Sequence, residues 1–466
     1  MSAFSHLWLG VTALRAFRRG MDTAGYNVAN ANTPGFSRRR VELAPLEPSA
    51  AAYNVPGLGV GVAAVRRDRD PFLDFATRRE MSRLGGDAAR TEVLTALEPA
   101  LTAVDGSALT GPLGDLFDAF EALAVQPDDP ALRRDAIAAA ENLAAAIRRF
   151  DARLAEARRA ADSRVADAVD RINEITRRLA QINAQQPVIE AGGPEASDLR
   201  DERDRLLDEL SHLAGVQVVY DERGRANVFL QATGDALVTG TTDMPLRLSP
   251  DGEGMQRVYV SRGGERVDLT GVLRLGKLGG LLAARDETLV AYRDRLDAFA
   301  TAVIEEFNAA HRAGFDLDGQ PGLALFLPDP PGARPAAAIE VNTSVADDPR
   351  RVAAASAAGE PGNNENALAL AGLRESTPAG LGGQTLLEAA SALVGEIGRD
   401  AATADLSRQA SASIVSSFES RRQEVSGVSL DEEAANLARW EQSFQAAARF
   451  MKVVNDVTEV ALQILR

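Results

Sequence analysis

Apolar residues recur every seven positions along the last part of the chain, from Ser429 to Arg466. One row holds Leu430, Leu437, Phe444, Met451, Thr458 and Leu465, and a second row holds Trp440, Ala447, Val454 and Ala461. This spacing predicts a helix with an a/d seam over about five heptads. Ser429 followed by Glu432 is typical of a capping box, which marks the start of the helix. A helix of roughly 55 Å with such an apolar face needs a partner helix, from this chain or from a neighbouring copy.

Residues 1–31 carry the same pattern. Leu7, Leu14, Met21 and Val28 recur every seven positions, and Phe17, Ala24 and Ala31 follow the last three of them. Alone, this pattern indicates an ordinary amphipathic helix that docks on its own core. The matching seam at the other end of the chain instead favours a two-helix arm, parallel or antiparallel. Six arginines against one aspartate in the first forty residues, and six acids against four bases from Ser429 on, modestly favour this pairing.

The chain between these ends predicts a helical body that a β insert interrupts. No Gly or Pro occurs between Pro130 and Asn183, and a buried row is expected at Ile147, Leu154, Ala161, Ala168, Ile175 and Ile182. We expect this long helix to end at residues 185–187, where Pro187 follows two glutamines. From Gly215 the hydrophobic period changes to two, with Gly and Asp turns between short runs, which predicts antiparallel strands.

The predicted fold is therefore mainly α, with long terminal coiled-coil helices, a helical-bundle body and a small inserted antiparallel β domain. The expected divisions are an N-terminal arm 1–45 that pairs with 429–466, body segments 46–214 and 385–428, the β insert 215–275, a returning helix 276–315, and a mixed strand and loop region 316–384.

Composition excludes several classes of function. The chain has 466 residues, a net charge of −16 and no cysteine. An acidic chain lacks the basic footprint of a nucleic-acid-binding protein, and without cysteine there is neither a disulfide nor a Cys-ligated metal. No apolar run is long enough to span a bilayer, and His6, Arg15, Arg18 and Arg19 interrupt any signal-peptide pattern. We expect a cytoplasmic protein, or one exported without a cleaved signal, and no membrane insertion.

No pattern of catalytic residues is present. His6, His212 and His311 are scattered, and no nucleophile, zinc or complete phosphate-loop motif occurs. Gly57–Gly61 matches only part of a phosphate loop, and Phe315–Gly319 lacks the later ligands of a calcium loop, so we predict a linker and a turn. We expect no catalytic, cofactor-binding or metal residues. An enzymatic alternative, such as a cell-wall hydrolase with a hidden carboxylate pair, would require measurable cleavage.

Two motifs resemble those of bacterial flagellar proteins. Ala29–Arg38 (Ala-Asn-Ala-Asn-Thr-Pro-Gly-Phe-Ser-Arg) resembles the signature of the flagellar axial proteins, which include rod, hook and hook-associated subunits. Val425–Leu437, with Leu-Asp-Glu-Glu-Ala-Ala-Asn-Leu, resembles the C-terminal motif of the flagellar hook-associated protein 1 family, and Gly57–Leu73, Leu275–Asp318 and Asn363–Leu370 agree in order. The motif residues are Asn30, Thr33, Pro34, Gly35, Phe36, Asp431, Glu432, Glu433 and Asn436.

This resemblance implies a structural component of the hook–filament junction, located on the extracellular flagellum. It implies terminal helices in an inner coiled-coil layer, export of the unfolded chain by the flagellar type III route, and self-assembly into a ring. The implied partners are other copies, the hook protein, the second hook-associated junction protein, and an export chaperone on the C-terminal helix. The short connector Pro328–Pro335 stands where some relatives carry a further outer domain.

We expect the apolar seams to become buried between subunits on polymerisation. The predicted subunit-interface residues are Leu7, Leu14, Phe17, Met21, Val28, Leu430, Leu437, Trp440, Phe444, Met451, Val454, Ala461 and Leu465. The alternatives are a hook or rod subunit proper, or a secreted helical adhesin or translocator whose amphipathic ends act at a membrane. The acidic tail disfavours the membrane version on anionic lipids.

Overall fold

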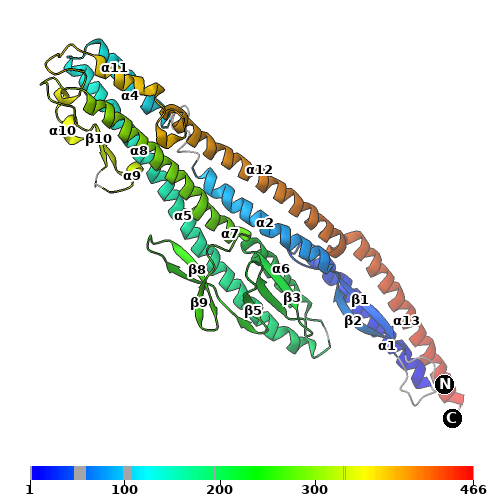
Figure 1. Ribbon diagram of the computed structural model, residues 1–466. Coiled ribbons are helices and arrows are strands. Elements are labelled where there is room, and N and C mark those ends of the chain that lie inside the picture. Colours follow the sequence, from blue (N-terminus) through cyan, green and yellow to red (C-terminus); the bar gives the residue numbers. More distant parts are fainter. Residues whose placement is uncertain are drawn as a thin grey trace.

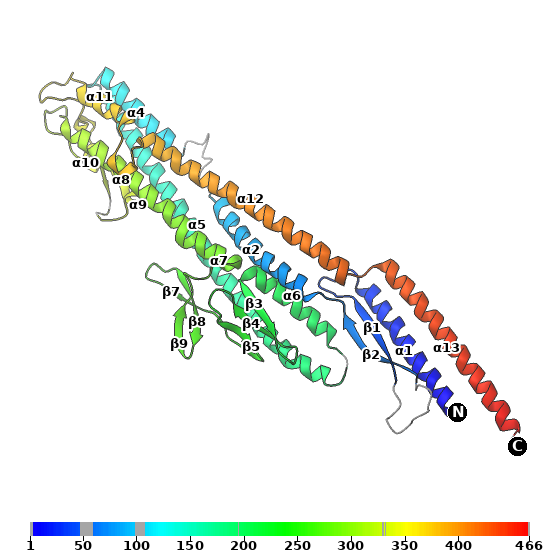
Figure 2. The same ribbon diagram turned by 45° about the vertical axis from the view of Figure 1, so that its right-hand side comes forward.

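The computed structural model describes residues 3–46, 59–97, 108–193, 195–328, 330 and 332–464. Figures 1 and 2 show an elongated molecule in which long helices run side by side along a body, and an arm continues from one end of it. Both chain ends lie at the tip of the arm. Among the described residues, no helix is long and apolar enough to cross a membrane.

The arm contains two helices and a hairpin. Helices α1 (Ala3–Asn30) and α13 (Leu430–Ile464) lie side by side, and α1 also packs on the hairpin of β1 (Arg39–Pro45) and β2 (Val60–Arg67). Strand β1 pairs antiparallel with β2, with a bulge between Glu42 and Leu43. The hairpin spans the boundary that we expected at residue 45, where we predicted only an extended linker. The division into domains stays a prediction.

The body is built around α5 (Pro130–Glu190), a 61-residue helix that is roughly 90 Å long. Pro187, where we expected the helix to end, lies inside its last turn. A proline removes only its own N–H bond to the residue four positions before it, and the turn still closes because the Ala191 N–H donates to the carbonyl oxygen of Pro187 at 3.0 Å. The predicted row from Ile147 to Ile182 is buried at all six positions, which confirms the seam on this helix. The body also contains the helices α2 (Pro71–Thr95), α6 (Ser197–Leu213), α8 (Leu289–Ala313) and α12 (Leu386–Ser426). The short helix α7 (Gly276–Ala283) and the π-helical turn η1 (Ala284–Thr288) lead into α8.

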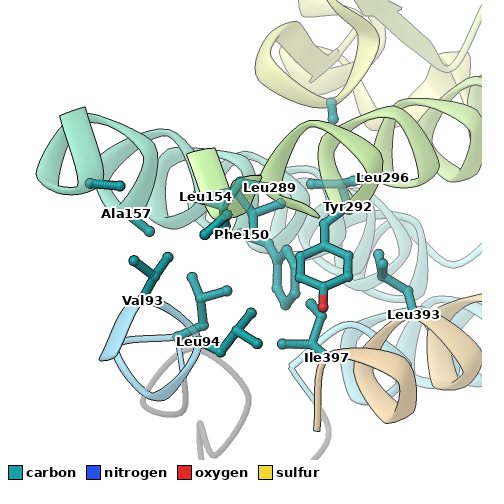
Figure 3. Close-up of a cluster of buried hydrophobic side chains, with 14 of the residues drawn as sticks. Val93, Leu94, Phe150, Leu154, Ala157, Leu289, Tyr292, Leu296, Leu393 and Ile397 are labelled. Carbon is teal, nitrogen blue, oxygen red and sulfur yellow. The ribbon is translucent and has the colours of Figure 1, made fainter. Parts of the chain in front are cut away.

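The hydrophobic core lies between these helices. Figure 3 shows one part of it, where Phe150 and Leu154 of α5 meet Leu94 of α2, Tyr292 of α8 and Ile397 of α12. The Tyr292 hydroxyl donates to Asp400 at 2.6 Å, so the one polar atom of this cluster is satisfied. Four long helices therefore share one core, and the body folds around it as a unit.

The β insert follows α6 and consists of two small antiparallel sheets, as the predicted fold required. The strand orders are β3-β4-β5-β6 and β7-β8-β9, with β3 (Val216–Tyr220), β4 (Ala226–Leu230), β5 (Ala236–Thr239), β6 (Thr242–Asp243), β7 (Arg247–Pro250), β8 (Gln256–Arg262) and β9 (Glu265–Asp268). The side-chain amide of Asn183 donates to and accepts from the backbone of Ala226, and that of Asn173 does the same with Leu246, at 2.8–2.9 Å. Asn183 also donates to the carbonyl oxygen of Gly240 at 2.7 Å. These side chains fasten the insert to the helix.

A buried arginine fastens the second sheet. Arg285 of the π-helical turn is 1% exposed, bonds Asp162 of α5 at 2.5 Å, and donates to the carbonyl oxygen of Gln256 at 2.7 Å. Asp162 in turn accepts from the Gln256 N–H at 2.8 Å. Single π-helical turns inside α-helices are rare and occur frequently at functional sites. Here the turn lies where Arg285 joins the body to the insert.

The far end of the body combines short elements. They are α4 (Thr110–Val125), β10 (Phe326–Pro328), α9 (Pro335–Ala338), β11 (Ile339–Val341), α10 (Thr343–Ala346), η2 (Pro349–Arg351), α11 (Glu365–Gly372), η3 (Leu373–Glu375) and η4 (Ala379–Leu381). Phe307 of α8 stacks on Phe117 at 5.7 Å and meets Phe326 edge-on at 5.9 Å. Strand β10 ends at Pro328, and α9 begins at Pro335.

His311 is buried at this far end. Its Nδ1 lies 2.6 Å from the carbonyl oxygen of Leu323, and its Nε2 accepts from the backbone N–H of Ala353 at 3.0 Å. The ring is therefore neutral, with its proton on Nδ1. Burial lowers the pKa of His311 from 6.5 to about 4, and the nearby charge of Arg133 acts in the same direction.

The pKa of His311 predicts an acid-sensitive contribution to stability. Because folding favours the neutral ring, this contribution is complete above pH 6.5 and is lost as the pH falls from 6.5 towards 4. The shift corresponds to about 3 kcal/mol of unfolding free energy. We expect His311→Gln to be less stable at pH 7 and to lose less stability between pH 7 and pH 4 than the parent, in denaturant titrations. Equal losses in both chains would contradict the neutral ring.

Candidate assembly site in the paired terminal helices

The partner of the C-terminal helix is the N-terminal helix of the same chain. Gly10 lies against Met451, Gly20 against Trp440, and Asn27 against Glu433. Residue numbers rise along α1 as they fall along α13, so the pair is antiparallel, as Figures 1 and 2 also show. The heptad pattern left open where the partner helix comes from and in which direction it runs. In a single molecule the partner comes from the same chain and runs antiparallel.

Glycines of α1 make room for large side chains of α13. A Cβ at Gly20 would lie 2.5 Å from the Trp440 ring, and one at Gly10 would lie 2.1 Å from the Met451 sulfur. The Trp440 ring also meets Phe17 at 6.1 Å between centroids. Sequence reasoning missed these glycines, although glycine inside a helix costs about 1 kcal/mol relative to alanine and so calls for an explanation.

Gly20→Leu is expected to open the helix pair in the arm. The new side chain would occupy the position of the Trp440 ring, and over-packing of this kind costs about 1–3 kcal/mol. The measurement is hydrogen exchange of α1 and α13, which should become faster while the body is unchanged. Gly25→Leu is a matched control, since nothing lies within 4 Å of a Cβ at Gly25. Slow exchange in Gly20→Leu would contradict this packing.

The predicted interface residues fall into three groups. Eight lie partly covered by the packing of the arm: Leu7, Leu14, Phe17, Met21, Trp440, Phe444, Met451 and Val454. Val28, Leu430 and Leu437 are exposed, at 43%, 56% and 39%. The side chain of Ala461 and all of Leu465 lie outside the described residues. Their role between subunits stays a prediction, because the structure contains one copy.

A further apolar row on α13 remains uncovered in the single chain. Phe450, Val453, Val457 and Val460 are 38–63% exposed and are spaced three, four and three residues apart, so they share one face of the helix. This row lies beside the seam that contacts α1, and at Phe450 it reaches that seam, since a Cβ at Gly10 would lie 3.5 Å from the Phe450 ring. The two heptad rows of the C-terminal helix do not include these four residues, so this row was not predicted.

The turn after α1 contains the first family motif and forms a corner. The Asn30 amide donates to the carbonyl oxygen of Tyr26 at 3.0 Å, and Thr33 N–H donates to the carbonyl oxygen of Asn30 at 2.9 Å. Gly35 adopts φ +80°, which favours glycine. Phe36 then packs against the Tyr26 ring at 5.8 Å. Pro34 is exposed and lies just beyond the end of α1, where a proline disfavours the helical conformation of the residue before it, Thr33.

The second motif starts α13 and meets this corner. Ser429 Oγ accepts from the Glu432 N–H at 3.4 Å, which caps the helix. Glu433 is 2% exposed and accepts from Arg38 Nε at 2.8 Å and from the Asn27 amide at 3.1 Å. Arg38 also pairs with the exposed Glu432 at 2.6 Å. Asp431 is exposed and Asn436 is half-buried, so Glu433 is the member of this motif that joins the two helices.

Ion pairs connect the arm to the body at the place that we call the elbow, where β2 leads into α2 and α12 leads into α13. Arg67 of β2 bonds Asp201 and Asp204 of α6 at 2.7 and 2.9 Å, and Arg39 of β1 pairs with Asp198. Burial alone would raise the pKa of Asp204. The guanidinium groups of Arg203, Arg67, Arg69 and Arg78 outweigh burial and hold this pKa well below its usual range.

The features of the arm are packing surfaces and ion pairs. Across the part of the chain that the structure describes, there is no group of three or more His, Asp or Glu side chains that could hold a metal ion. His6 lies on α1, His212 on α6 and His311 on α8. The arm thus presents exposed apolar rows, a helix pair and a charged corner.

Comparison with known families identifies the chain. Residues 94–326, half of the chain, match the family described as the flagellar hook-associated protein FlgK helical domain. Residues 8–36 match the flagella basal body rod protein family, and residues 419–464 match the C-terminal family of the basal body rod FlgEFG proteins. These two ranges coincide with α1 and its corner and with α13.

Curated relatives match almost the whole chain. Flagellar hook-associated protein 1 of Escherichia coli is 25% identical over 540 residues, which cover 97% of this chain and 98% of that protein. The protein of the same name from Salmonella typhimurium is 26% identical over 556 residues, covering 99% and 100%. Because these alignments are longer than the 466 residues of this chain, the relatives carry insertions relative to it.

A solved structure shares the fold. The flagellar hook junction protein FlgK from Burkholderia pseudomallei superposes with a TM-score of 0.68, covering 75% of this chain and 100% of that chain, at 18% identity. The chain therefore belongs to the flagellar hook-associated protein 1 (FlgK) family, and it is a structural component of the hook–filament junction of the bacterial flagellum.

Proposed function

We propose that this chain builds the junction by helical self-assembly through its paired terminal helices. The observation that carries the proposal is the uncovered row of Phe450, Val453, Val457 and Val460 on α13. The arm already uses its glycine-lined seam for internal pairing, so this row is what remains for a neighbouring copy. Leu430, Leu437 and Val28 extend the exposed apolar surface on the two helices.

Burial of this row supplies a modest energy for each contact. Complete burial of a Val or Phe side chain contributes about 1.5–3 kcal/mol, so four side chains that are about half exposed contribute a few kcal/mol. A ring repeats that contact around its circumference, and contacts that are weak singly become stable together. The predicted interface set, from Leu7 to Leu465, belongs to this assembly surface.

We assign the following partners on the same grounds. The junction position requires contact with the hook protein on one side and with the second hook-associated junction protein on the other. An export chaperone would cover the apolar face of α13 before the protein is secreted, because an exposed row of this kind promotes association. The role is structural and not enzymatic.

The position of the protein on purified flagella tests the proposal. The chain has no cysteine, so Glu265→Cys on the exposed strand β9 introduces a single site for a gold-maleimide label. We expect label only between hook and filament. Label along the hook or in the rod would instead support a hook or rod subunit, the alternative favoured by the rod-family matches at both chain ends. Flagella that carry the cysteine-free parent give the background.

A further inference from the structure

The hydrophobic core of the body stops before the elbow. In the first half of α2 the buried side chains include Asp74, Thr77, Arg78 and Ser82, and the core residues of this helix begin only at Ala89. Within the described part of the chain, no residue of α1, β1, β2 or α13 belongs to the core cluster. The arm and the body are therefore not joined by a shared apolar core.

Charged side chains take the place of that core. Helix α6 presents Asp198, Asp201 and Asp204 at intervals of three residues towards arginines of the hairpin. Beside the elbow, within the body, Arg422 of α12 bonds Asp208 of α6 at 2.6 Å and lies 3.2 Å from Asp74 of α2. The end of α12 meets the arm through the Arg38 N–H, which donates to the carbonyl oxygen of Ser426 at 2.8 Å. The surface between arm and body is thus a layer of ion pairs between secondary-structure elements.

This layer leaves several buried polar atoms without a hydrogen bond, although the Nε atoms of Arg69 and Arg422 lie 3.3 and 3.2 Å from the Asp74 carboxylate as ion pairs. Nine such side-chain atoms occur among the described residues, and seven lie at the elbow: Ser37 Oγ, Arg39 Nε, Arg69 Nε, Asp74 Oδ1, Arg422 Nε and Nη2, and Ser426 Oγ. A cleft of about 890 Å³ opens beside them, between the corner of α1 and the end of α12. Buried polar groups in apolar interfaces are nearly all hydrogen-bonded, so the elbow differs from such an interface in its polar character.

Among the described residues, two chain segments cross the elbow: residues 68–70 between β2 and α2, and residues 427–429 between α12 and α13. Each is three residues long and non-helical, as hinge segments are. Figures 1 and 2 show α12 and α13 meeting at a bend there. Interfaces that are small and polar leave relative motion of the two parts as the default.

We propose that the elbow is an electrostatically latched joint: the arm turns as one body about residues 68–70 and 427–429, and the ion pairs of α6 with Arg39 and Arg67 set its angle. The joint goes beyond assembly through the arm and does not depend on it. It lets one molecule present its α13 row at more than one angle to its body. Neither the arm nor the body has to unfold for this movement, since each keeps its own packing.

The inner and outer pairs contribute unequally to the latch. The side chains of Arg67 and Asp204 are 7% and 5% exposed, whereas that of Asp198 is 75% exposed. Exposed ion pairs contribute little to stability and are screened by salt, whereas removing one partner of a buried pair strongly destabilises the structure around it. Removing Arg67 should therefore release the joint more than removing Arg39, and salt should release it only in part.

Distance distributions between spin labels test this joint. In the cysteine-free chain, Gln445→Cys on α13 and Ala160→Cys on α5 place labels on exposed positions of arm and body. With Arg67→Gln we expect the arm–body distribution to broaden and its mean to shift. With Arg39→Gln, or at high ionic strength, we expect a smaller shift in the same sense. An unchanged distribution in Arg67→Gln would overturn the proposal.

Control pairs and a control variant separate the joint from general loosening. A pair within the arm (Arg18→Cys with Gln445→Cys) and a pair within the body (Ala160→Cys with Ala402→Cys) should keep their widths. Arg178→Gln removes the arginine of α5 that pairs with Glu202 of α6 inside the body, and it should leave the arm–body distribution unchanged. If Arg67→Gln does not fold, Arg39→Gln decides, and an unchanged distribution there would also overturn the joint. Broadening of the arm pair itself would do the same.

Discussion

A chain that ends at Ser429 is expected to keep a folded body and to lose assembly of the junction completely. The deletion removes α13, which contributes no residue to the described core cluster, so the four-helix packing of the body persists. It also removes the partner of α1, the buried Glu433 and the uncovered row from Phe450 to Val460. The apolar face of α1 is then left with only the hairpin, and no helix pair remains to join a neighbouring copy.

Two measurements separate these effects. Thermal unfolding followed by circular dichroism should retain the transition of the body, and cells that carry only the shortened chain should fail to grow filaments. A full-length control with Val453, Val457 and Val460 changed to Gln should keep the helix pair, whose seam contains Trp440 and Met451, but should still fail in assembly. Filament growth with the shortened chain would refute the role of the arm, and loss of the body transition would refute its independence.

Glu433→Ala is expected to open the arm at its corner. The substitution leaves Arg38 and the Asn27 amide without their buried acceptor, and breaking a buried pair in this way costs roughly 3–5 kcal/mol. Arg38 retains Glu432, so the lower end of that range is expected. Glu432→Ala is the matched control: the same arginine loses an acceptor that is 62% exposed, which costs about 1 kcal/mol or less.

Hydrogen exchange resolves this difference along the chain. In Glu433→Ala, amides of α1 near Asn27 and of the first turns of α13 should exchange faster by a factor of roughly a hundred, the equivalent of about 3 kcal/mol. Amides of α5 and α8 should be unchanged. Similar rates in the two variants would show that burial of Glu433 does not stabilise the corner.

Hydrophobic periodicity predicted the long helices and missed the arrangement of the arm. The heptad rows placed α1, α5 and α13 within a few residues, because an apolar stripe at this spacing fits no other regular structure. The same rows could not say that α1 and α13 run antiparallel. That choice depends on Gly10 and Gly20, which receive Met451 and Trp440, and a glycine carries no hydrophobic signal.

The hairpin of β1 and β2 was missed for a different reason. Arg39–Pro45 and Val60–Arg67 mix charged and apolar residues without clear alternation, and their burial patterns are irregular. Their pairing depends on a long-range match across the intervening residues and on the face of α1 that covers them. Local sequence contains little of this information, whereas the antiparallel strands of the insert, with tight Gly and Asp turns, could be predicted.

The sequence predicted where the candidate site lies better than it predicted the contacts within the site. The two motifs identified the corner, and Glu433 at its centre was among the motif residues. The ion pairs of α6 were not predicted, because acids on a helical face look like solvated charge until an arginine from a distant strand meets them. Asp204 and Arg67 are 137 positions apart in the sequence.

The antiparallel pairing of α1 with α13 also has a practical consequence for fusion proteins. Because both ends of the chain lie together at the tip of the arm, a fluorescent protein attached to either end would be carried to the same place (Figure 1). Both fusions would crowd the same neighbours in the assembled flagellum. A reporter that leaves the arm clear has to be inserted in a surface turn far from that tip, such as Gly263–Gly264 between β8 and β9, where a Cβ meets no other atom.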